Sequence, residues 1–171
     1  MRLWLLRHAK SSWDDDRLAD RDRPLAPRGE RDADHLAEHL VASDVRPALV
    51  LCSAGLRARQ TLGRVFHGLG DAFEVRVEPG LYTFDASTLL SRLRSVLDDV
   101  PSVMIVGHNP ALQELALTLV DRGDGIGRLA AKFPTCALAD IELRVDAWRE
   151  AAPATGTLLG LTIPRDLGAD A

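Results

Sequence analysis

Residues 1–10, MRLWLLRHAK, hold the stretch that decides how this chain folds. Leu3 to Leu6 is a continuous apolar run of strand length, and it ends at the polar pair Arg7-His8. A run of this kind, bounded by polar residues, is typical of a strand that is buried on both faces of a sheet. Three further runs are predicted to be strands in the same way: residues 48–52, 73–77 and 102–106.

Segments with apolar residues at helical spacing alternate with these runs. Ala33, Leu36, Leu40 and their neighbours predict a helix that has Pro27 in its first turn. Further helices are predicted over 56–66, over 87–97, and from Pro110 to about 120 with Asn109 as its cap. The alternation predicts an α/β fold with three α/β/α layers, in which helices cover both faces of a mostly parallel central sheet.

The C-terminal part of the chain has a weaker pattern. Residues 137–145 and 158–163 are predicted to be two antiparallel strands near a sheet edge, and residues 122–127 a glycine-rich loop. We expect residues 166–171 to be frayed. Because neither an internal repeat nor a linker is visible, we expect residues 1–171 to form a single domain.

Composition narrows the classes of protein to consider. The formal net charge of −4 gives no support to nucleic-acid binding, and any anion site must come from locally gathered arginines. The two cysteines, Cys52 and Cys136, fit reduced core thiols. No apolar run approaches the ~20 residues of a membrane span, and residues 1–4 lack a secretory pattern. We therefore expect a cytoplasmic protein that binds neither nucleic acid nor membranes.

Polar residues gather where the predicted strands end. The first strand ends in Arg7-His8, the second leads into residues 53–59, and the fourth ends in Gly107-His108. Ligands of open α/β sheets bind outside the carboxyl ends of the strands, so two histidines and at least two arginines are predicted to face one crevice.

This set of side chains suits phosphoryl transfer. Guanidinium groups offer planar forks of donors that match phosphoryl oxygens. They also disfavour protonation of a neighbouring imidazole, whose reference pKa is ~6.5, and so keep it nucleophilic. A covalent phosphohistidine would form and then be hydrolysed, and this chemistry needs no metal or other cofactor.

Four motifs make the chain resemble the histidine phosphatase superfamily, also called the phosphoglycerate mutase-like family. They are LRHAK at 6–10, Arg23-Pro24-Leu25 followed by Gly29, SAGLRARQT at 53–61, and VGHNP at 106–110. The resemblance covers residues 1 to about 120. Length and spacing are most similar to the small SixA-type phosphohistidine phosphatases. A phosphoglycerate mutase-like fold is implied.

The resemblance also implies roles for individual residues. His8 would accept the phosphoryl group. Four residues would contact the substrate: Arg7, Arg57, His108 and Arg23. The first two would hold the phosphoryl oxygens, and His108 would donate a hydrogen bond to them. Arg57 is preferred over Arg59 because it directly precedes the alanine of its motif.

One feature departs from the family pattern. Many members carry a glutamate, shortly after the leucine that follows their third strand, that protonates the leaving group. Here Leu81 is followed by residues 82–84 without a carboxylate. Asp85 is the nearest candidate proton donor, although it also suits a helix N-cap, and Glu78 lies on the other side.

The missing acid favours a substrate with a good leaving group. General acid catalysis is typically worth ~10²–10⁴-fold, and an imidazole with pKa ~6.5 needs it far less than an alkoxide does. We therefore expect a phosphorylated protein as partner, with phosphohistidine as the group removed. A carboxylate arriving from the loop 14–22 would undermine this preference.

Other functions remain open on the sequence alone. The same chemistry would serve a small phosphomonoester such as a sugar phosphate or a nucleotide, and a non-catalytic phosphate-binding module would use similar residues. A mutase is disfavoured because the chain is short. His35-Leu36-Ala37-Glu38-His39 matches the H-x-x-E-H zinc-protease pattern. Its polar residues are predicted on or near the solvated face of a helix, which does not favour a closed zinc site.

Overall fold

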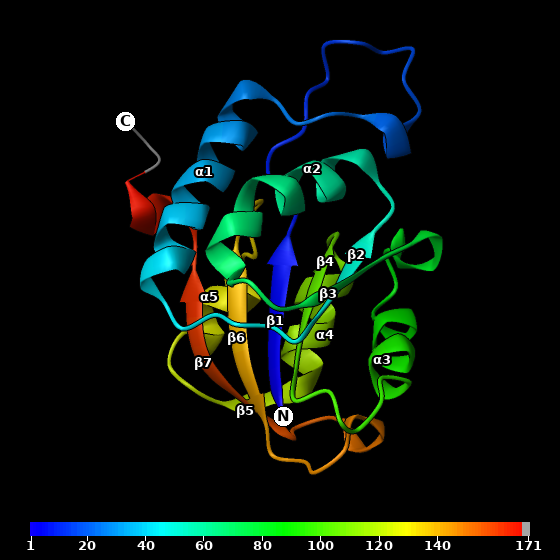
Figure 1. The fold of residues 1–171 in the computed structure, drawn as a ribbon, viewed down its shortest axis with the longest axis vertical. Coiled ribbons are helices and arrows are strands. Elements are labelled where there is room, and N and C mark those ends of the chain that lie inside the picture. Colours follow the sequence, from blue (N-terminus) through cyan, green and yellow to red (C-terminus); the bar gives the residue numbers. More distant parts are fainter. Residues whose placement is uncertain (169–171) are drawn as a thin grey trace.

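The computed structural model describes residues 1–168, and it contains a seven-stranded sheet in the order β3-β2-β4-β1-β6-β7-β5 (Figure 1). The strands are β1 (Arg2–Arg7), β2 (Leu49–Ser53), β3 (Glu74–Glu78), β4 (Ser102–Gly107), β5 (Val120–Arg122), β6 (Leu138–Leu143) and β7 (Gly156–Thr162). β1, β4, β2 and β3 are mutually parallel, whereas β6 is antiparallel to both β1 and β7. The predicted mostly parallel sheet is confirmed.

Five α-helices cover this sheet: α1 (Pro27–Ala42), α2 (Leu56–Val65), α3 (Ala86–Arg94), α4 (Ala111–Leu119) and α5 (Ile126–Ala131). Short 3-10 turns occupy Asp20–Asp22, Phe66–Leu69, Pro79–Leu81, Trp148–Glu150 and Pro164–Leu167. Pro27 opens α1 at one of its first two positions, as its fixed φ and missing N–H allow.

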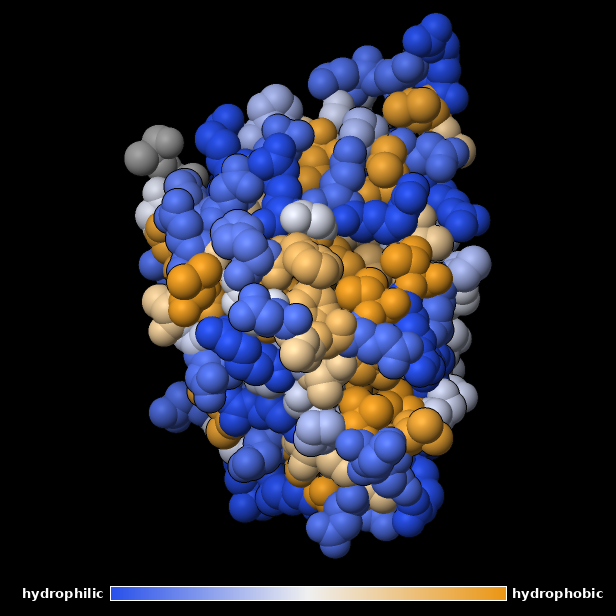
Figure 2. All heavy atoms as spheres, viewed as in Figure 1, coloured by the Kyte–Doolittle hydropathy of each residue, from blue (hydrophilic) through white to orange (hydrophobic). Residues whose placement is uncertain are grey.

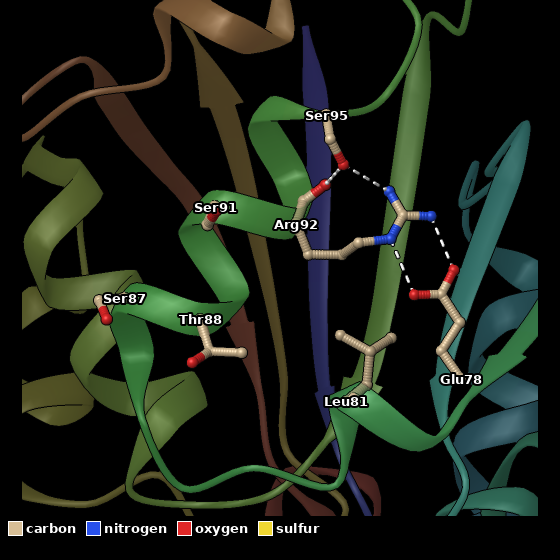
Figure 3. A pocket seen from close by; sticks show the side chains of 8 residues that line it. Glu78, Leu81, Ser87, Thr88, Ser91, Arg92 and Ser95 are labelled. Carbon is tan, nitrogen blue, oxygen red and sulfur yellow. Dashed lines mark hydrogen bonds and ion pairs between the residues drawn. The ribbon is translucent and has the colours of Figure 1, made fainter.

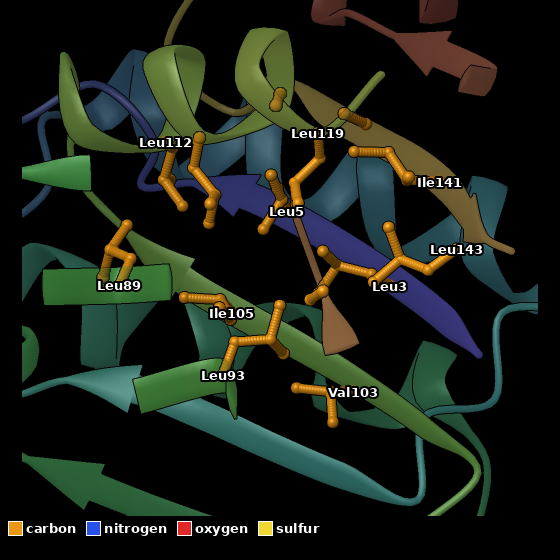
Figure 4. Packing of buried hydrophobic residues seen from close by; sticks show 14 of the residues in the cluster. Leu3, Leu5, Leu89, Leu93, Val103, Ile105, Leu112, Leu119, Ile141 and Leu143 are labelled. Atoms are coloured by element: carbon orange, nitrogen blue, oxygen red, sulfur yellow. The ribbon is translucent and has the colours of Figure 1, made fainter. Parts of the chain in front are cut away.

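Alternation along β1 divides the core between the two faces of the sheet. Leu3 and Leu5 belong to a cluster with α3, α4 and α5, which Figure 4 shows around Leu5 and Ile105. Trp4 and Leu6 belong to the second cluster, with α1 and α2. Since successive side chains of a strand point to opposite faces, one apolar run serves both clusters and requires helices on both sides.

The C-terminal half departs from the sequence-based prediction in two places. The expected loop 122–127 contains the end of β5 and the start of α5, so a three-residue strand and a six-residue helix were missed. β6 and β7 are antiparallel, as predicted, and β7 lies next to the edge strand β5, but β6 lies next to the central β1. Elements this short carry too few residues for a periodic signal.

The predicted cap of α4 is also wrong. Asn109 makes no capping bond, Pro110 is the N-cap residue, and the helix begins at Ala111. The Asn109 side chain instead donates to Gln113 Oε1 and to the Phe133 carbonyl, each at a distance of 3.1 Å. Asn109 thereby ties the end of β4 to the segment that precedes β6.

The face seen in Figure 2 varies in hydropathy along its length. Figure 2 shows hydrophilic residues over the upper end, where Figure 1 has the loop between β1 and α1, and apolar side chains nearer the middle of the same face. Near the C-terminus, where fraying was expected, Asp166 lies in the last 3-10 turn and pairs with Arg128 at 2.8 Å. Residues 169–171 of that expectation lie outside the described residues. Within 1–168, no helix combines the length and the apolar character that a membrane crossing requires.

Candidate active site

The carboxyl ends of β1, β2 and β4 meet at one edge of the sheet, as predicted. Arg7 pairs in register with Gly107, and Cys52 pairs with Val106, so the residues that follow these strands lie side by side. A cavity of about 600 Å³ opens there, and it is lined by twelve residues: Arg7, His8, Lys10, Ser11, Trp13, Asp20, Arg23, Arg57, Tyr82, Phe84, Asn109 and Thr135. Four of the predicted site residues therefore line a single cavity.

His8 is held as a neutral imidazole with a defined tautomer. Its Nδ1 lies 2.7 Å from the Ala9 carbonyl, which only accepts, so Nδ1 carries the hydrogen. Nε2 accepts from Arg57 Nε at 3.2 Å and therefore bears the lone pair. The ring is 7 % exposed, and burial above all, followed by the nearby charges of His108, Arg57 and Arg7, lowers the His8 pKa to about 3.

His108 packs beside His8, with their ring centroids 5.1 Å apart. Its Nε2 lies 2.7 Å from the Ser53 hydroxyl, which itself accepts from the Gly55 amide at 3.2 Å. Its Nδ1 has no hydrogen-bond partner among residues 1–168. Burial lowers the His108 pKa to about 4, assisted by the charge of Arg57. The ring is 1 % exposed, so this second histidine is also neutral near pH 7.

The glycine of the second motif, Gly55, leaves room for two rings, those of Tyr82 and His108. A Cβ at position 55 would lie 3.1 Å from the Tyr82 ring and 3.2–3.3 Å from His108. Both aromatic rings therefore approach the backbone at Gly55 more closely than a larger residue would comfortably allow.

Two guanidinium groups, that of the buried Arg57 and that of the half-buried Arg7, supply the positive charge. Arg57, in the first turn of α2, is 4 % exposed and lines the cavity, whereas Arg59 is exposed and is not among the lining residues. Arg7 donates to the Phe133 carbonyl at 2.7 Å, and its buried Nε has no partner within the described residues. Burial and the charge of Arg57 lower the Arg7 pKa. Buried donors without partners are uncommon, and those of Arg7 and His108 suit an anionic ligand.

Asp20 brings a carboxylate into the site from the loop 14–22. Arg57 donates to its Oδ2 at 2.9 Å, and Arg23 donates to its Oδ1 at 2.9 Å. Tyr82 also donates a hydrogen bond to Oδ2, and this bond, with those from the two arginines, lowers the Asp20 pKa to about 2. Asp20 is therefore a carboxylate at neutral pH. The preference for an imidazole leaving group would be undermined by a carboxylate from the loop 14–22, and Asp20 is such a carboxylate.

Arg23 also reaches the site. It is 6 % exposed, and its guanidinium donates to Ser11 Oγ at 2.6 Å and to the Ser12 carbonyl at 2.9 Å. The indole of Trp13 covers it, with Arg23 Cζ 3.1 Å from the ring centroid. Trp13 lines the cavity and is itself 72 % exposed, so its indole ring is accessible to a ligand that enters the cavity.

The other motif residues position these groups. Thr61 Oγ1 accepts from the Ala9 amide at 2.9 Å, next to His8, and donates to the Arg57 carbonyl at 2.7 Å. Gln60 Oε1 accepts from the Leu25 amide at 2.8 Å and so holds the segment between β1 and α1 against α2. A Cβ on Gly29 would lie 2.1 Å from a backbone oxygen of the segment after His8. The spacing of these motifs thus reflects contacts that fix His8 relative to Arg57.

Asp85 is not placed as a proton donor. It is the N-cap of α3, where its carboxylate accepts from the Ser87 and Thr88 amides, and these bonds and those from the two hydroxyls hold its pKa near 2. Asp85 is not among the residues that line the cavity at His8. The other candidate, Glu78, forms an ion pair with Arg92 at 2.7 Å in a separate pocket, shown in Figure 3. Neither carboxylate is available to a leaving group, and the expectation for Asp85 is corrected.

The zinc-protease pattern does not form a metal site. Glu38 is exposed on α1, and His35 and His39 are half-buried. His39 Nε2 lies 3.3 Å from Oγ of Ser43, the C-cap residue of α1. No group of three or more metal-ligating side chains occurs within residues 1–168.

Three residues near His8 were missed as site residues by the sequence: Ser53, Tyr82 and Asp20. Ser53 is the last residue of β2, and Tyr82 comes after the 3-10 turn that follows β3, so nearness to a strand end was the available signal. A carboxylate from the loop 14–22 was considered, but this charged loop lacks a periodic pattern that would select Asp20 among its aspartates.

Comparison with known proteins identifies a family and several similar structures. Residues 3–92 match the histidine phosphatase superfamily (branch 1). An uncharacterized protein of Mycobacterium leprae is 36 % identical over 168 residues, which cover 94 % of this chain and 100 % of that protein. The SixA protein of Nakamurella multipartitia has a similar structure, with a TM-score of 0.81 and 28 % identity over 95 % of each chain. The protein histidine phosphatase SixA complexed with tungstate gives a TM-score of 0.78 and 27 % identity, covering 98 % of this chain and 99 % of that one.

Proposed function

This chain belongs to the histidine phosphatase superfamily (branch 1) and is of the SixA type, and we propose that it removes phosphate from phosphohistidine in proteins through a covalent intermediate on His8. The observation that carries the proposal is the state of His8. Its Nδ1 hydrogen is bound by a backbone carbonyl, its Nε2 lone pair faces Arg57, and its pKa is lowered to about 3. A buried, neutral imidazole beside guanidinium groups is a nucleophile prepared for a phosphoryl anion.

In the proposed reaction the Nε2 lone pair of His8 forms a bond to phosphorus while the bond from phosphorus to the substrate imidazole breaks. The imidazole leaves with the electron pair of that bond and takes up a proton. Water then attacks phosphorus, the bond to His8 breaks, and inorganic phosphate is released. Arg7 and Arg57 bind the phosphoryl oxygens, and His108 donates from Nδ1 when Ser53 donates to its Nε2. Because these residues supply both nucleophile and charge, the proposal includes independence from metal ions.

The experiment is a comparison of wild type and His8→Ala on a phosphohistidine peptide, p-nitrophenyl phosphate and a sugar phosphate, with EDTA present. We expect turnover to be fastest on the phosphohistidine peptide and to disappear in the variant. Brief incubation with labelled phosphopeptide should trap phosphate on the wild-type chain in an acid-labile, base-stable bond. If the wild type binds phosphate but turns over none of these substrates, the chain is a binding module and the proposal is wrong.

Asp20 favours a second candidate, the same chemistry on a small phosphomonoester. A phosphoryl group bound to Arg57 would compete with the Asp20 carboxylate for the same guanidinium. Loss of that contact, together with the added negative charge, raises the pKa of Asp20 and makes it a better proton donor to an alkoxide. In this case Asp20→Asn should lower kcat on the sugar phosphate by about 10²-fold or more while sparing the phosphohistidine peptide. Equal effects on both substrates would remove this support for a phosphomonoester.

A further inference from the structure

A second cavity, of about 450 Å³, adjoins the site and shares Arg7, Lys10 and Thr135 with it. Its other basic residues come from segments far apart in the chain: Arg28 from the first turn of α1, Lys132 from the residue after α5, and Arg165 from the last 3-10 turn. Five cations and one carboxylate, Asp32, therefore line this cavity. We call it the basic cavity.

The charge of the basic cavity contrasts with that of the whole molecule. The chain carries a formal net charge of −4, and most of its arginines pair with carboxylates. The only two lysines in the sequence, Lys10 and Lys132, both line the basic cavity. Neither they nor Arg7 form an ion pair with any residue in 1–168. Arg28 lies 3.9 Å from the Asp32 carboxylate. Lys10, Lys132 and Arg7, gathered at one place on an acidic protein, create a local positive potential that attracts anions.

The position and size of the basic cavity indicate what kind of anion it takes. Because Arg7 and Lys10 border both cavities, a ligand whose phosphoryl group lies at His8 can extend directly into the second one. The volume of about 450 Å³ is many times that of a single phosphate group. Pro134, Ile163 and Pro164 add apolar lining between the cations. Exposed lysines are flexible point charges that do not demand one planar partner, unlike a fork of arginines built for a single oxyanion.

We propose that the basic cavity binds an acidic segment of the phosphorylated protein, next to the phosphohistidine, and thereby selects substrates. The inference rests on the proposed function and names the feature of the substrate that the site recognises. Aspartate and glutamate side chains would lie against Lys10, Lys132 and Arg165, and their apolar stems against the prolines. Because these cations are exposed, the contribution acts on KM and on association more than on the chemical step.

The test uses two phosphohistidine peptides of the same length, one with glutamates and one with glutamines beside the phosphohistidine. At low salt we expect wild type to prefer the acidic peptide by roughly tenfold in kcat/KM, mostly through KM, as a few exposed ion pairs allow. The preference should fall below about threefold in Lys132→Gln/Arg165→Gln and at high ionic strength. Arg76→Gln, which removes one positive charge from the opposite edge strand β3, is the matched control and should keep the wild-type preference.

The outcomes separate this inference from the function beneath it. Turnover of both peptides at equal rates by wild type would overturn the basic cavity as a docking site and leave the phosphohistidine phosphatase intact. No turnover of either peptide would overturn the proposed function. It would also overturn the acidic protein segment as the ligand of the basic cavity. A further outcome is a double variant that keeps the wild-type preference between the peptides but loses a preference of wild type for a sugar bisphosphate over the monophosphate. That result would overturn the acidic segment as ligand and show that the cavity binds a second phosphate of a small substrate. Circular dichroism on each variant checks that folding is unchanged.

Discussion

Acidification should unfold this protein unusually early, because two neutral histidines are buried in its site. The unfolded chain binds a proton on each imidazole as the pH falls through ~6.5. The folded protein resists protonation until pH about 3 at His8 and about 4 at His108. Between these limits the unfolded state binds more protons, so the free energy of unfolding is largest above pH 6.5 and decreases as the pH falls.

The size of the effect follows from these shifts. At 1.36 kcal/mol per pH unit, each histidine should remove about 1.6 kcal/mol of stability between pH 6.5 and pH 5, and the pair about 3 kcal/mol. A total stability of about 5–15 kcal/mol makes this a large fraction. Burial is the main cause of both shifts, since the two rings are 7 % and 1 % exposed and are little screened by solvent.

Urea unfolding at pH 6.5 and at pH 5 measures this quantity in wild type, in His8→Asn, in His108→Asn and in the double variant. Each single variant should lose about 1.6 kcal/mol less than wild type over this interval. The double variant gives the part that carboxylates and other groups contribute. If wild type and the double variant lose the same free energy, the two histidines titrate normally in the folded protein, and burial does not hold His8 neutral.

Three further substitutions test individual contacts. Arg57→Lys keeps the charge but loses the planar fork, so kcat on any phosphorylated substrate should fall about 10²-fold, and a loss below threefold would argue against phosphoryl binding by this side chain. Gly29→Ala places a Cβ 2.1 Å from the Lys10 carbonyl oxygen and should cost about 1–3 kcal/mol or more in urea unfolding; wild-type stability would mean that α1 moves freely against the segment after His8. Asp85→Ala removes the N-cap of α3 and should lower the midpoint of thermal unfolding by a few degrees with kcat unchanged, whereas a large loss of kcat would restore Asp85 as proton donor.

Much of the site was predictable because its residues follow strands with strong local signals. His8 and His108 directly follow β1 and β4, and parallel strands must bring their carboxyl ends to one edge. The continuous apolar run of residues 3–6 predicted a strand buried on both faces, and the alternation of strands with helices along the chain predicted the helices that cover them. Arg57 could be separated from Arg59 by its place in a motif, and the structure shows the underlying cause, since Thr61 ties the Arg57 turn to the segment after His8.

Other features depended on distances that no local pattern encodes. β5 is too short for a periodic signal and exists only because β7 is there to pair with it. Asp85 suited both a proton donor and a helix N-cap by its place in the sequence, and the structure shows the N-cap, in which the amides at the start of α3 donate to its carboxylate.

The sequence by itself determined the strand ends and predicted His8 and Arg57 as site residues, because these depend on hydrophobic periodicity and on residue order along the chain. Only the tertiary structure decided which carboxylate enters the site, where the lysines gather and which nitrogen of His8 bears the lone pair. Asp20 meets Arg57 and Tyr82 across 37 and 62 residues, and Lys10 shares a cavity with Lys132 and Arg165. Contacts between such distant residues are set by how loops pack on the finished sheet, and the proton on His8 is set by a single backbone carbonyl.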